Sequence, residues 1–203
     1  MQHTDDDTSR ALLEAAHRLL SEHGAEALTV RRIATGAGMS TMNVYSRFGG
    51  KDGVIDVLYI DGFERLFAVV DAVPSSDHTA HDLMEVAQAY RQFALDNPTY
   101  YRIMFRSAIH DFTPSEAASS MTVEGLERFV ERVRVGQERG DIVNHGGFEP
   151  LEIGTWLWAT CHGLVSLELE QVGRDRFSWA TVFEHGMWTA ICGLHPSVWR
   201  ARV

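Results

Sequence analysis

The sequence predicts an all-α fold of about nine helices. Apolar residues recur every three or four positions along most of the 203 residues, and no segment alternates polar and apolar residues as a strand would. Glycines, prolines and short polar residues separate these segments at positions that suit helix ends. With 45% hydrophobic and 23% charged residues, the chain can bury a substantial core.

Three short helices are expected at the N-terminus, followed by one long helix. The first begins near Arg10, and Gly24 ends it. Thr29 can cap the second helix, Gly38 breaks it, and Ser40 can cap the third. At 1.5 Å per residue the fourth helix would be about 34 Å long. In chain order these helices are expected over residues 10–23, between Thr29 and Gly38, and over 41–48 and 51–73.

Prolines and one polar motif mark the starts of the later helices. Pro98 and Pro150 stand at first helical positions, where a missing backbone N–H costs no hydrogen bond. The motif from Thr113 to Glu116 has the pattern of a capping box with Pro114 at the first position. These helices are expected over residues 82–96, 98–108, 114–140, 150–171 and 177–191.

The composition argues against a secreted, membrane-spanning or metal-dependent protein. Cys161 and Cys192 are too few for a disulfide framework and indicate a reducing cytoplasm. The acidic N-terminus does not resemble a secretory signal. The most apolar uncharged run, residues 153–167, is shorter than the roughly 18 residues of a membrane helix. No metal-binding motif occurs. We expect a cytoplasmic protein without a membrane span, metal or cofactor.

No catalytic constellation is apparent, so an enzyme is not expected. Cys161 directly precedes His162, and neighbouring side chains on a helix point about 100° apart. This geometry is poor for a nucleophile and its base.

Charge divides the chain into two regions. The net charge is −10, yet residues 8–53 carry six cationic side chains against four acidic ones, including the only lysine, Lys51. From residue 54 onward, 12 arginines stand against 21 acidic residues. We therefore predict a weakly basic domain over 8–53 and an acidic helical domain over 54–203.

The third expected helix has one apolar and one polar side. Val44 and Phe48, four residues apart, share a face and can pack inward. The helix N-terminus at Ser40 can meet a phosphate. Two short helices joined at Gly38 fit a helix-turn-helix. The outward side suits base edges and phosphates, and it consists of Met42, Asn43, Ser46 and Arg47, with Tyr45 on one flank.

Arg32 is unusual for its position. It stands three residues after the Thr29 cap, where a cation opposes the helix dipole by roughly 0.3–1 kcal/mol. A nearby DNA phosphate would offset this cost. A solvated arginine that tolerates it is an equal alternative.

The stretch "ALTVRRIATGAGMSTMNVYSRFGGKDGVI" resembles the N-terminal domain of the tetracycline-repressor (TetR) family. It departs from the family at Gly36 and at the pair Gly49–Gly50. The resemblance implies that Tyr45 and Lys51 contact phosphates and that Arg31 reaches the DNA groove from the second helix. It also places the base-facing or backbone-facing positions at Thr41, Met42, Asn43, Ser46 and Arg47, and the domain core at Leu28, Ile33, Ala34, Val44 and Phe48.

The later chain resembles a C-terminal subgroup of these regulators through "WATCHG", a Trp-x-x-x-His-Gly pattern. The resemblance implies a pocket for a small molecule and a homodimer formed by the last two helices. The sequence independently favours a dimer, because both helices are apolar on nearly all sides. The alternative is that their aromatic residues form only the core of a monomer. The expected interface residues are Trp156, Leu164, Leu167, Trp179, Phe183, Met187 and Trp188.

Aromatic and methionine side chains suit a largely apolar effector, although at helical spacing they can equally be plain core. The candidate pocket residues are Phe63, Phe67, Met84, Tyr90, Phe93, Tyr101, Met104, Phe105, His110, Met121, Trp158 and His162. For His162 a hydrogen-bonded core position is favoured over ligand contact.

These patterns predict a ligand-responsive transcriptional regulator. It would bind a palindromic double-stranded DNA operator as a homodimer and act as a repressor that a small apolar effector releases. The alternatives are an activator, a ligand-independent DNA-binding regulator, or an all-helical enzyme or interaction module.

Overall fold

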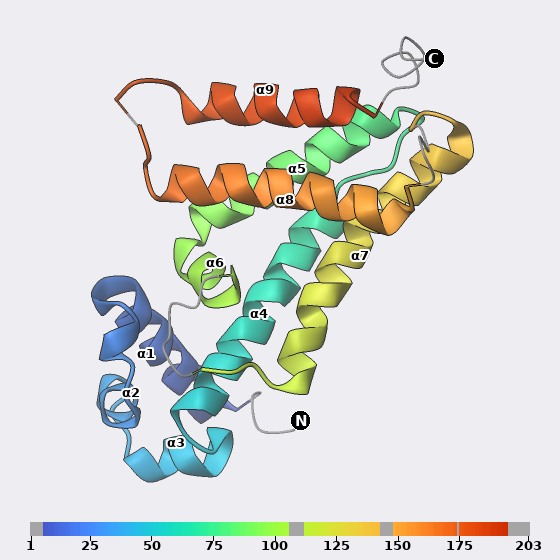
Figure 1. Cartoon of the computed structure of the whole chain (residues 1–203). Helices are drawn as coiled ribbons and strands as arrows, with labels where there is room; N and C mark the ends of the chain where they lie inside the picture. The colour runs from blue at the N-terminus through green and yellow to red at the C-terminus, as the bar shows by residue number, and fades with distance from the viewer. Residues whose placement is uncertain (1–5, 106–111, 143–147, 174, 195–203) are drawn as a thin grey trace. The chain divides into compact units, whose positions relative to one another are not determined.

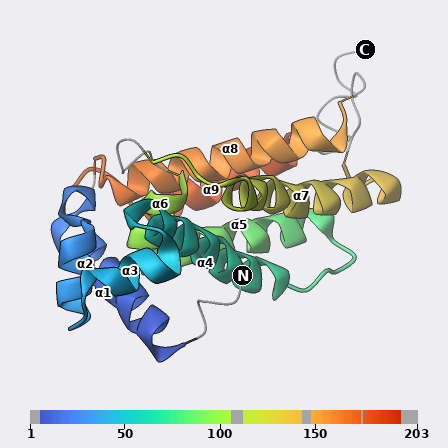
Figure 2. The same ribbon diagram turned by 90° about the horizontal axis from the view of Figure 1, so that it is seen from below.

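The computed structural model describes residues 6–105, 112–142, 148–173 and 175–194. Within these ranges the chain forms nine α-helices and one short 3₁₀ helix, and no strand is present (Figure 1; Figure 2). The all-α prediction is confirmed.

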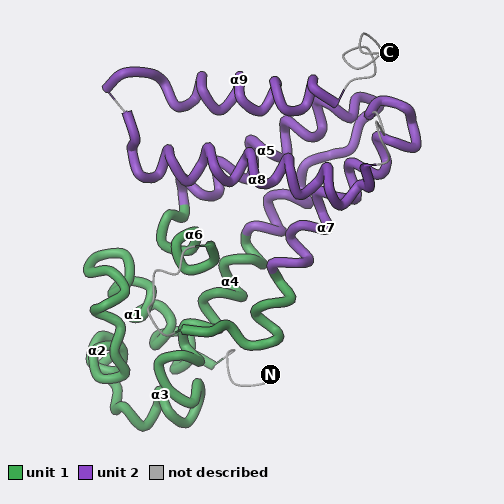
Figure 3. The backbone as a smooth tube through the Cα atoms, viewed as in Figure 1, with its two compact units in different colours: residues 1–65, 97–121 green, residues 66–96, 122–203 purple. Residues whose placement is uncertain are grey.

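The chain packs into two compact units, coloured separately in Figure 3. Unit 1 comprises residues 1–65 and 97–121, and unit 2 comprises residues 66–96 and 122–203. Two of the three divisions fall within helices, α4 (Lys51–Asp71) and α7 (Glu116–Arg139), and the third follows Asp96, the last residue of α5 (Thr79–Asp96). The predicted functional boundary after residue 53 therefore does not coincide with a division of the packing, and it stays a prediction.

Unit 1 contains the predicted helix-turn-helix. Its core includes Leu12, Ile33 and Val44, all fully buried. Arg18 Nη2 donates to the carbonyl oxygen of Gly36 over 3.0 Å, which places a cation at the C-terminal end of a helix, where the helix dipole favours it. Besides parts of α4 and α7, the helices of this unit are α1 (Asp7–His23), the 3₁₀ helix η1 (Ala25–Ala27), α2 (Val30–Gly36), α3 (Thr41–Phe48) and α6 (Pro98–Phe105).

Glycines shape the two turns that flank α3. Gly38 has φ +69°, and beside it the N–H of Met39 donates to the Ala34 carbonyl over 2.8 Å, a bond typical of a left-handed helix end. After α3 the chain approaches itself closely, because a Cβ built at Gly53 would overlap the carbonyl oxygen of Phe48. The turn into α4 is thus fixed by backbone packing.

Unit 2 is a layer of long helices. Helices α8 and α9 run antiparallel side by side, and both pack on α5 (Figure 1). Pro150 is the first residue of α8, as predicted, and the N–H of Glu149 donates to the Glu152 carboxylate over 2.9 Å. The helices of this unit are the end of α4, α5 (Thr79–Asp96), most of α7, α8 (Pro150–Leu169) and α9 (Trp179–Cys192).

The predicted start of α7 was wrong by two residues. Ser115, not Thr113, precedes the helix, and its Oγ accepts from the N–H of Ala118 over 3.1 Å. The Asp56 carboxylate accepts from both the N–H and the Oγ of Ser115, over 2.8 and 2.6 Å. A distant carboxylate therefore selected the cap, which the local motif could not indicate.

Candidate DNA-binding surface and effector site

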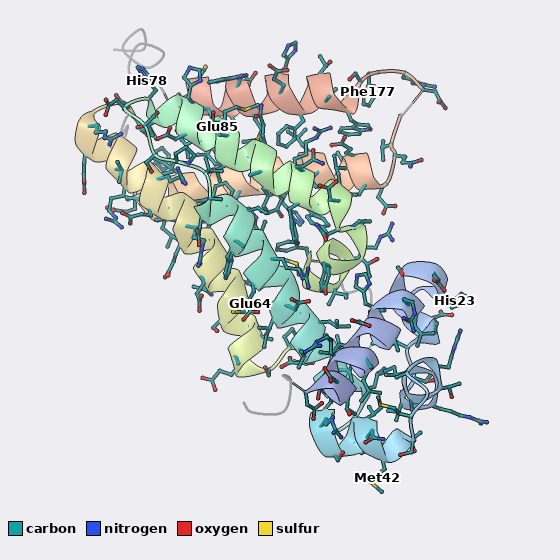
Figure 4. All side chains as sticks on the ribbon, turned by 180° about the vertical axis from the view of Figure 1, so that it is seen from behind. His23, Met42, Glu64, His78, Glu85 and Phe177 are labelled. Carbon is teal, nitrogen blue, oxygen red and sulfur yellow. The ribbon has the colours of Figure 1, made fainter. Side chains whose placement is uncertain are left out.

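Helix α3 buries one side and exposes the other. Val44 is fully buried, whereas Met42 is 70% and Tyr45 55% exposed. Figure 4 shows Met42 projecting outward from α3. Thr41 and Ser46 are also exposed. Met42, Tyr45 and Ser46 therefore face outward and Val44 inward as predicted, whereas Asn43, Arg47 and Phe48 are half-buried.

The predicted hydroxyl cap of α3 was wrong. Ser40 stands at the N-cap position, but its side chain accepts no bond from the helix backbone. Its Oγ instead accepts from Asn43 Nδ2 over 3.3 Å. The amide of Asn43 competes for the hydroxyl, and the free N–H groups of the α3 N-terminus stay available to another acceptor, such as a DNA phosphate.

Arg47 does not lie free on the outward side. Its Nη2 donates to Asp6 Oδ2 over 3.1 Å, its Nε to Asp6 Oδ1 over 3.4 Å, and its Nη1 to Asn43 Oδ1 over 3.1 Å. Its side chain is 23% exposed. Arg47 thus lies beside the exposed side of α3, and its guanidinium is paired with the carboxylate of Asp6 at the start of α1.

The other cations of this region differ from Arg47. No Asp or Glu side chain in the described part of the chain lies within ion-pair distance of Arg31, Arg32 or Lys51. Arg31 and Arg32 are exposed, and Lys51 is half-buried at the first position of α4. Thr29 caps α2 as predicted, since its Oγ1 accepts from the N–H of Arg32 over 3.2 Å. These cations are available to an anionic partner.

Helices α8 and α9 expose apolar side chains. Trp156 is 46% and Leu167 48% exposed on α8. The predicted interface residues Leu164, Trp179 and Trp188 are half-buried. Phe183 and Met187, in contrast, are buried within unit 2 itself. Phe183 lies under the guanidinium of Arg91, 5.3 Å from its ring centre, which explains its burial in the chain's own core.

Two family models match the chain. The model of bacterial regulatory proteins of the tetR family matches residues 12–58, and the model of the tetracyclin repressor-like C-terminal domain matches residues 83–190. The chain belongs to the TetR family. This is a family of regulatory proteins and not of enzymes, and the first match covers the helix-turn-helix described above.

Individual relatives agree with this assignment. The HTH-type transcriptional regulator Rv1816 of Mycobacterium tuberculosis is 26% identical over 135 residues, which are 64% of this chain and 58% of that relative. The chain therefore spans less than two thirds of the length of this curated relative.

Two solved structures share the TetR fold seen here. A protein of unknown function from Rhodococcus sp. RHA1 has a TM-score of 0.81 and 24% identity, covering 96% of this chain and 99% of the other. The fatty acid degradation regulator FadR from Bacillus halodurans has a TM-score of 0.72 and 14% identity, covering 92% and 96%. At these identities the likeness concerns the fold.

For this TetR-family chain, the predicted effector residues fall into two groups. Phe63, Tyr101, Met104, Phe105 and Met121 belong to unit 1, whereas Phe67, Met84, Tyr90, Phe93, Trp158 and His162 belong to unit 2. His110 lies outside the described residues. Within each unit, some of these residues belong to an aromatic cluster.

The unit 1 cluster contains four aromatic rings. The ring of Phe63 lies 5.3 Å from that of Phe105, and the ring of Tyr101 lies 5.0 Å from Phe105. Tyr59, which the sequence analysis did not select, lies 5.2 Å from Phe63. Contacts of this kind stabilise a core, and they equally suit the wall of an apolar site.

The unit 2 cluster contains a polar chain. The hydroxyl of Tyr90 and Nδ1 of His162 are 3.0 Å apart, and Nε2 of His162 lies 3.4 Å from the Ser166 hydroxyl. Trp158 packs 5.7 Å from His162, and Phe129 lies 6.3 Å from Tyr90. The prediction of a hydrogen-bonded His162 is confirmed. The sequence analysis did not select Phe129 or Ser166, because each fits the ordinary helical pattern of its segment and nothing local marks it as a contact of Tyr90 or His162.

One buried ion pair also escaped the sequence analysis. Arg91 Nε donates to Glu168 Oε2 over 2.7 Å and Arg91 Nη2 to Glu168 Oε1 over 2.5 Å, joining α5 to α8. A glutamate near the end of so apolar a helix was the available signal, because buried carboxylates require a partner. This pair fixes α5 and α8 in one arrangement.

Two clefts lie outside the predicted effector residues. One in unit 2, of about 580 Å³, lies between α5 and α9 and includes Glu85, Arg91 and Phe183. One in unit 1, of about 960 Å³, lies between α1, α4 and α6. None of the predicted effector residues in the described ranges lines either cleft.

A charged cluster lines the unit 1 cleft. The Tyr100 hydroxyl donates to Asp61 Oδ2, and Arg65 Nε donates to Asp61 Oδ1 over 2.9 Å. The ring of His17 lies 4.9 Å from that of Tyr100 and is tilted 39° against it. Burial, with the nearby charge of Arg65, lowers the pKa of His17, and burial with the Asp61 bond raises the pKa of Tyr100. These groups connect α1, α4 and α6 without an ionised histidine at neutral pH.

The described ranges show neither a metal-binding cluster nor a membrane-spanning helix. No group of three or more His, Cys, Asp or Glu side chains there is arranged to hold a metal ion. No helix there has both the length and the apolar character needed to cross a bilayer. Cys161 is fully buried, and burial raises the pKa of its thiol, whereas Cys192 is exposed.

Proposed function

We propose that this protein is a cytoplasmic transcriptional repressor that binds a palindromic DNA operator as a homodimer and is released by a small, largely apolar effector. The observation that carries the DNA-binding part is the outward side of α3. It presents hydroxyl, amide and aromatic groups on a helix of the size that fits a major groove. Arg31, Arg32 and Lys51 add cations for the phosphates.

The apolar surface of α8 and α9 supports the homodimer. Trp156, Leu167 and Leu151 are each about half exposed on α8, and α9 packs beside this helix. A second copy of the same surface would remove these side chains from water. Each large side chain would be buried in both protomers. At roughly 25 cal/mol per Å² of apolar area, this burial would contribute substantially to the free energy of dimerisation. Two-fold symmetry would in turn match a palindromic operator.

The Tyr90–His162 pair supports an effector with an apolar body and a polar group. These two side chains place hydrogen-bonding atoms beside the rings of Phe129 and Trp158. An effector acts only by binding one state of the protein better than another. Release from DNA thus requires tighter binding to the form that does not bind the operator.

A ligand-independent regulator is the second candidate. The observation that favours it is that candidate effector residues such as Phe63, Tyr90 and Tyr101 are almost fully buried, as ordinary core side chains are. In this case the clusters are core alone.

The test has two stages. Purified protein selects fragments from random duplex DNA, and the enriched sequence is bound in the presence of long-chain fatty acids and aromatic hydrocarbons as probes. We expect an inverted repeat and at least one probe that weakens binding. An enriched sequence that no probe affects would favour the ligand-independent candidate. Absence of any enrichment would refute the DNA-binding proposal.

The sign of regulation needs a separate measurement. A reporter gene whose promoter overlaps the selected sequence should lose expression when the protein is present, because an occupied operator blocks the promoter. Higher expression would instead identify an activator.

A further inference from the structure

The carboxylate of Asp6 joins the start of α1 to α3. Asp6 Oδ1 accepts from the N–H of Ser9 over 2.6 Å and so caps α1. The same carboxylate holds Nε and Nη2 of Arg47 over 3.4 and 3.1 Å. The remaining Arg47 nitrogen, Nη1, donates to Asn43, whose Nδ2 donates to Ser40. One hydrogen-bonded chain thus orders the groups on this side of α3.

This arrangement occupies the part of Arg47 that DNA would use. A guanidinium presents two parallel N–H donors to a carboxylate, a phosphate or the edge of a guanine in the same way. Asp6 takes that place in the free protein. The Ser9 N–H and the Arg47 guanidinium lower the pKa of the Asp6 carboxyl from 3.8 to about 2. The carboxylate is therefore ionised at every pH at which DNA binding would be measured.

We propose that Asp6 is a specificity-determining residue, which competes with DNA phosphates for Arg47 and thereby lowers affinity for arbitrary sequences. The inference rests on the proposed function, because it concerns the same DNA-binding surface. Binding to arbitrary DNA derives from phosphate neutralisation. A cation already paired with a carboxylate gains little from a phosphate. Only a site that offers Arg47 a better partner, such as a guanine edge, offsets the loss of the Asp6 pair.

The structure provides a matched pair of variants. Asp6→Asn removes the charge but retains an N-cap, because asparagine and aspartate cap helices about equally well. Asp7→Asn removes a charge from the same turn without touching Arg47, since the Asp7 carboxylate accepts from Arg10 Nη1 over 3.0 Å. If Asp6→Asn fails to fold, Asp6→Ser retains the cap by another side chain.

Fluorescence anisotropy of labelled duplexes over a range of salt concentrations measures the effect. The duplexes are the sequence selected by the wild-type protein and a scrambled version of it. For the scrambled duplex, Asp6→Asn should raise affinity about twofold to fivefold at low salt. It should also steepen the dependence of log K on log salt by about 0.9, the contribution of one more phosphate contact. The ratio of selected to scrambled affinity should fall. Asp7→Asn should change neither the ratio nor the slope appreciably.

A double variant isolates the part played by Arg47. In an Arg47→Gln background, Asp6→Asn should alter binding no more than Asp7→Asn does. Equal effects of Asp6→Asn and Asp7→Asn in the wild-type background would overturn the inference, as would weaker binding of Asp6→Asn to the scrambled duplex. The wild-type preference for the selected sequence would then still support the proposed function. If the wild-type protein shows no such preference, the proposed function fails and this inference fails with it.

Discussion

Helices α3 and α8 each leave one side uncovered, but they expose opposite chemistry. Helix α3 exposes Met42, Tyr45 and Ser46 around a single fully buried valine. Helix α8 buries Leu157, Cys161 and Val165 and exposes a tryptophan and leucines. A hydrated polyanion can satisfy the first surface, whereas only another apolar surface can satisfy the second. The difference supports the proposed DNA-binding role for α3 and the proposed assembly role for α8.

The largest expected effect tests the exposed side of α8. Leu167→Glu would place a charge twice in a symmetric apolar interface, at a cost of several kcal/mol. We expect the dimer dissociation constant to rise about a hundredfold or more, with a corresponding loss of operator affinity because each half-site is bound separately. Sedimentation velocity over a range of protein concentrations measures the first effect.

Val123→Glu is the matched control for Leu167→Glu. Val123 is 58% exposed on α7 and belongs to the same unit, but not to α8 or α9. It should leave the oligomeric state unchanged. A Leu167→Glu protein that stays dimeric would remove α8 from the interface and break the comparison with α3.

The buried side of α3 is tested by Val44→Ala. The substitution removes two methyl groups from a fully buried site between short helices. It should lower the free energy of unfolding by about 1.5–3 kcal/mol. Urea denaturation followed by circular dichroism measures this change. Val69→Ala on α4, where the side chain is exposed, should alter stability by less than about 0.5 kcal/mol. Equal effects of the two substitutions would mean that Val44 does not anchor α3.

The polar link on the buried side of α8 is tested by Tyr90→Phe. The variant retains the ring but loses the hydroxyl that lies 3.0 Å from His162. We expect a loss of about 1 kcal/mol of unfolding free energy and weaker binding of any effector that uses this pair. Tyr45→Phe on α3 should leave stability nearly unchanged, because the Tyr45 hydroxyl is on an exposed side chain. An unchanged stability of Tyr90→Phe would indicate that the hydroxyl contributes nothing to the core.

The two helices also differ in how far the sequence predicted them. Periodicity and caps predicted nine helices, and the inward position of Val44 on α3 followed from spacing alone. The pairing of Arg47 with Asp6 could not be predicted, because the two residues are 41 positions apart and local sequence patterns carry no information on such pairs. The same limit applies to Asp56, which holds Ser115 as the cap of α7.

For α8, the sequence indicated apolar character but not which residues face the chain's own core. The buried Phe183 and Met187 on α9 are as apolar as the half-exposed Trp179 and Trp188. Only the packing of α5 against α8 and α9, including the Arg91–Glu168 pair, distinguishes them. Hydropathy identifies side chains that avoid water, and the choice between core and interface depends on tertiary contacts.

The smallest expected effect concerns Lys51, at the edge of the α3 surface. As the first residue of α4, its ammonium stands where the helix dipole is unfavourable for a cation, so an external anion would be its natural partner. If Lys51 neutralises one phosphate, Lys51→Ala should lower affinity for selected and scrambled duplexes alike by a few-fold at low salt. It should reduce the salt slope by about one.

Arg10→Ala provides a control. Arg10 already pairs with Asp7, so its substitution should leave the slope unchanged. An unchanged slope for Lys51→Ala would show that the phosphate contacts come from other cations, and the DNA-binding surface would then end with α3 instead of extending into α4.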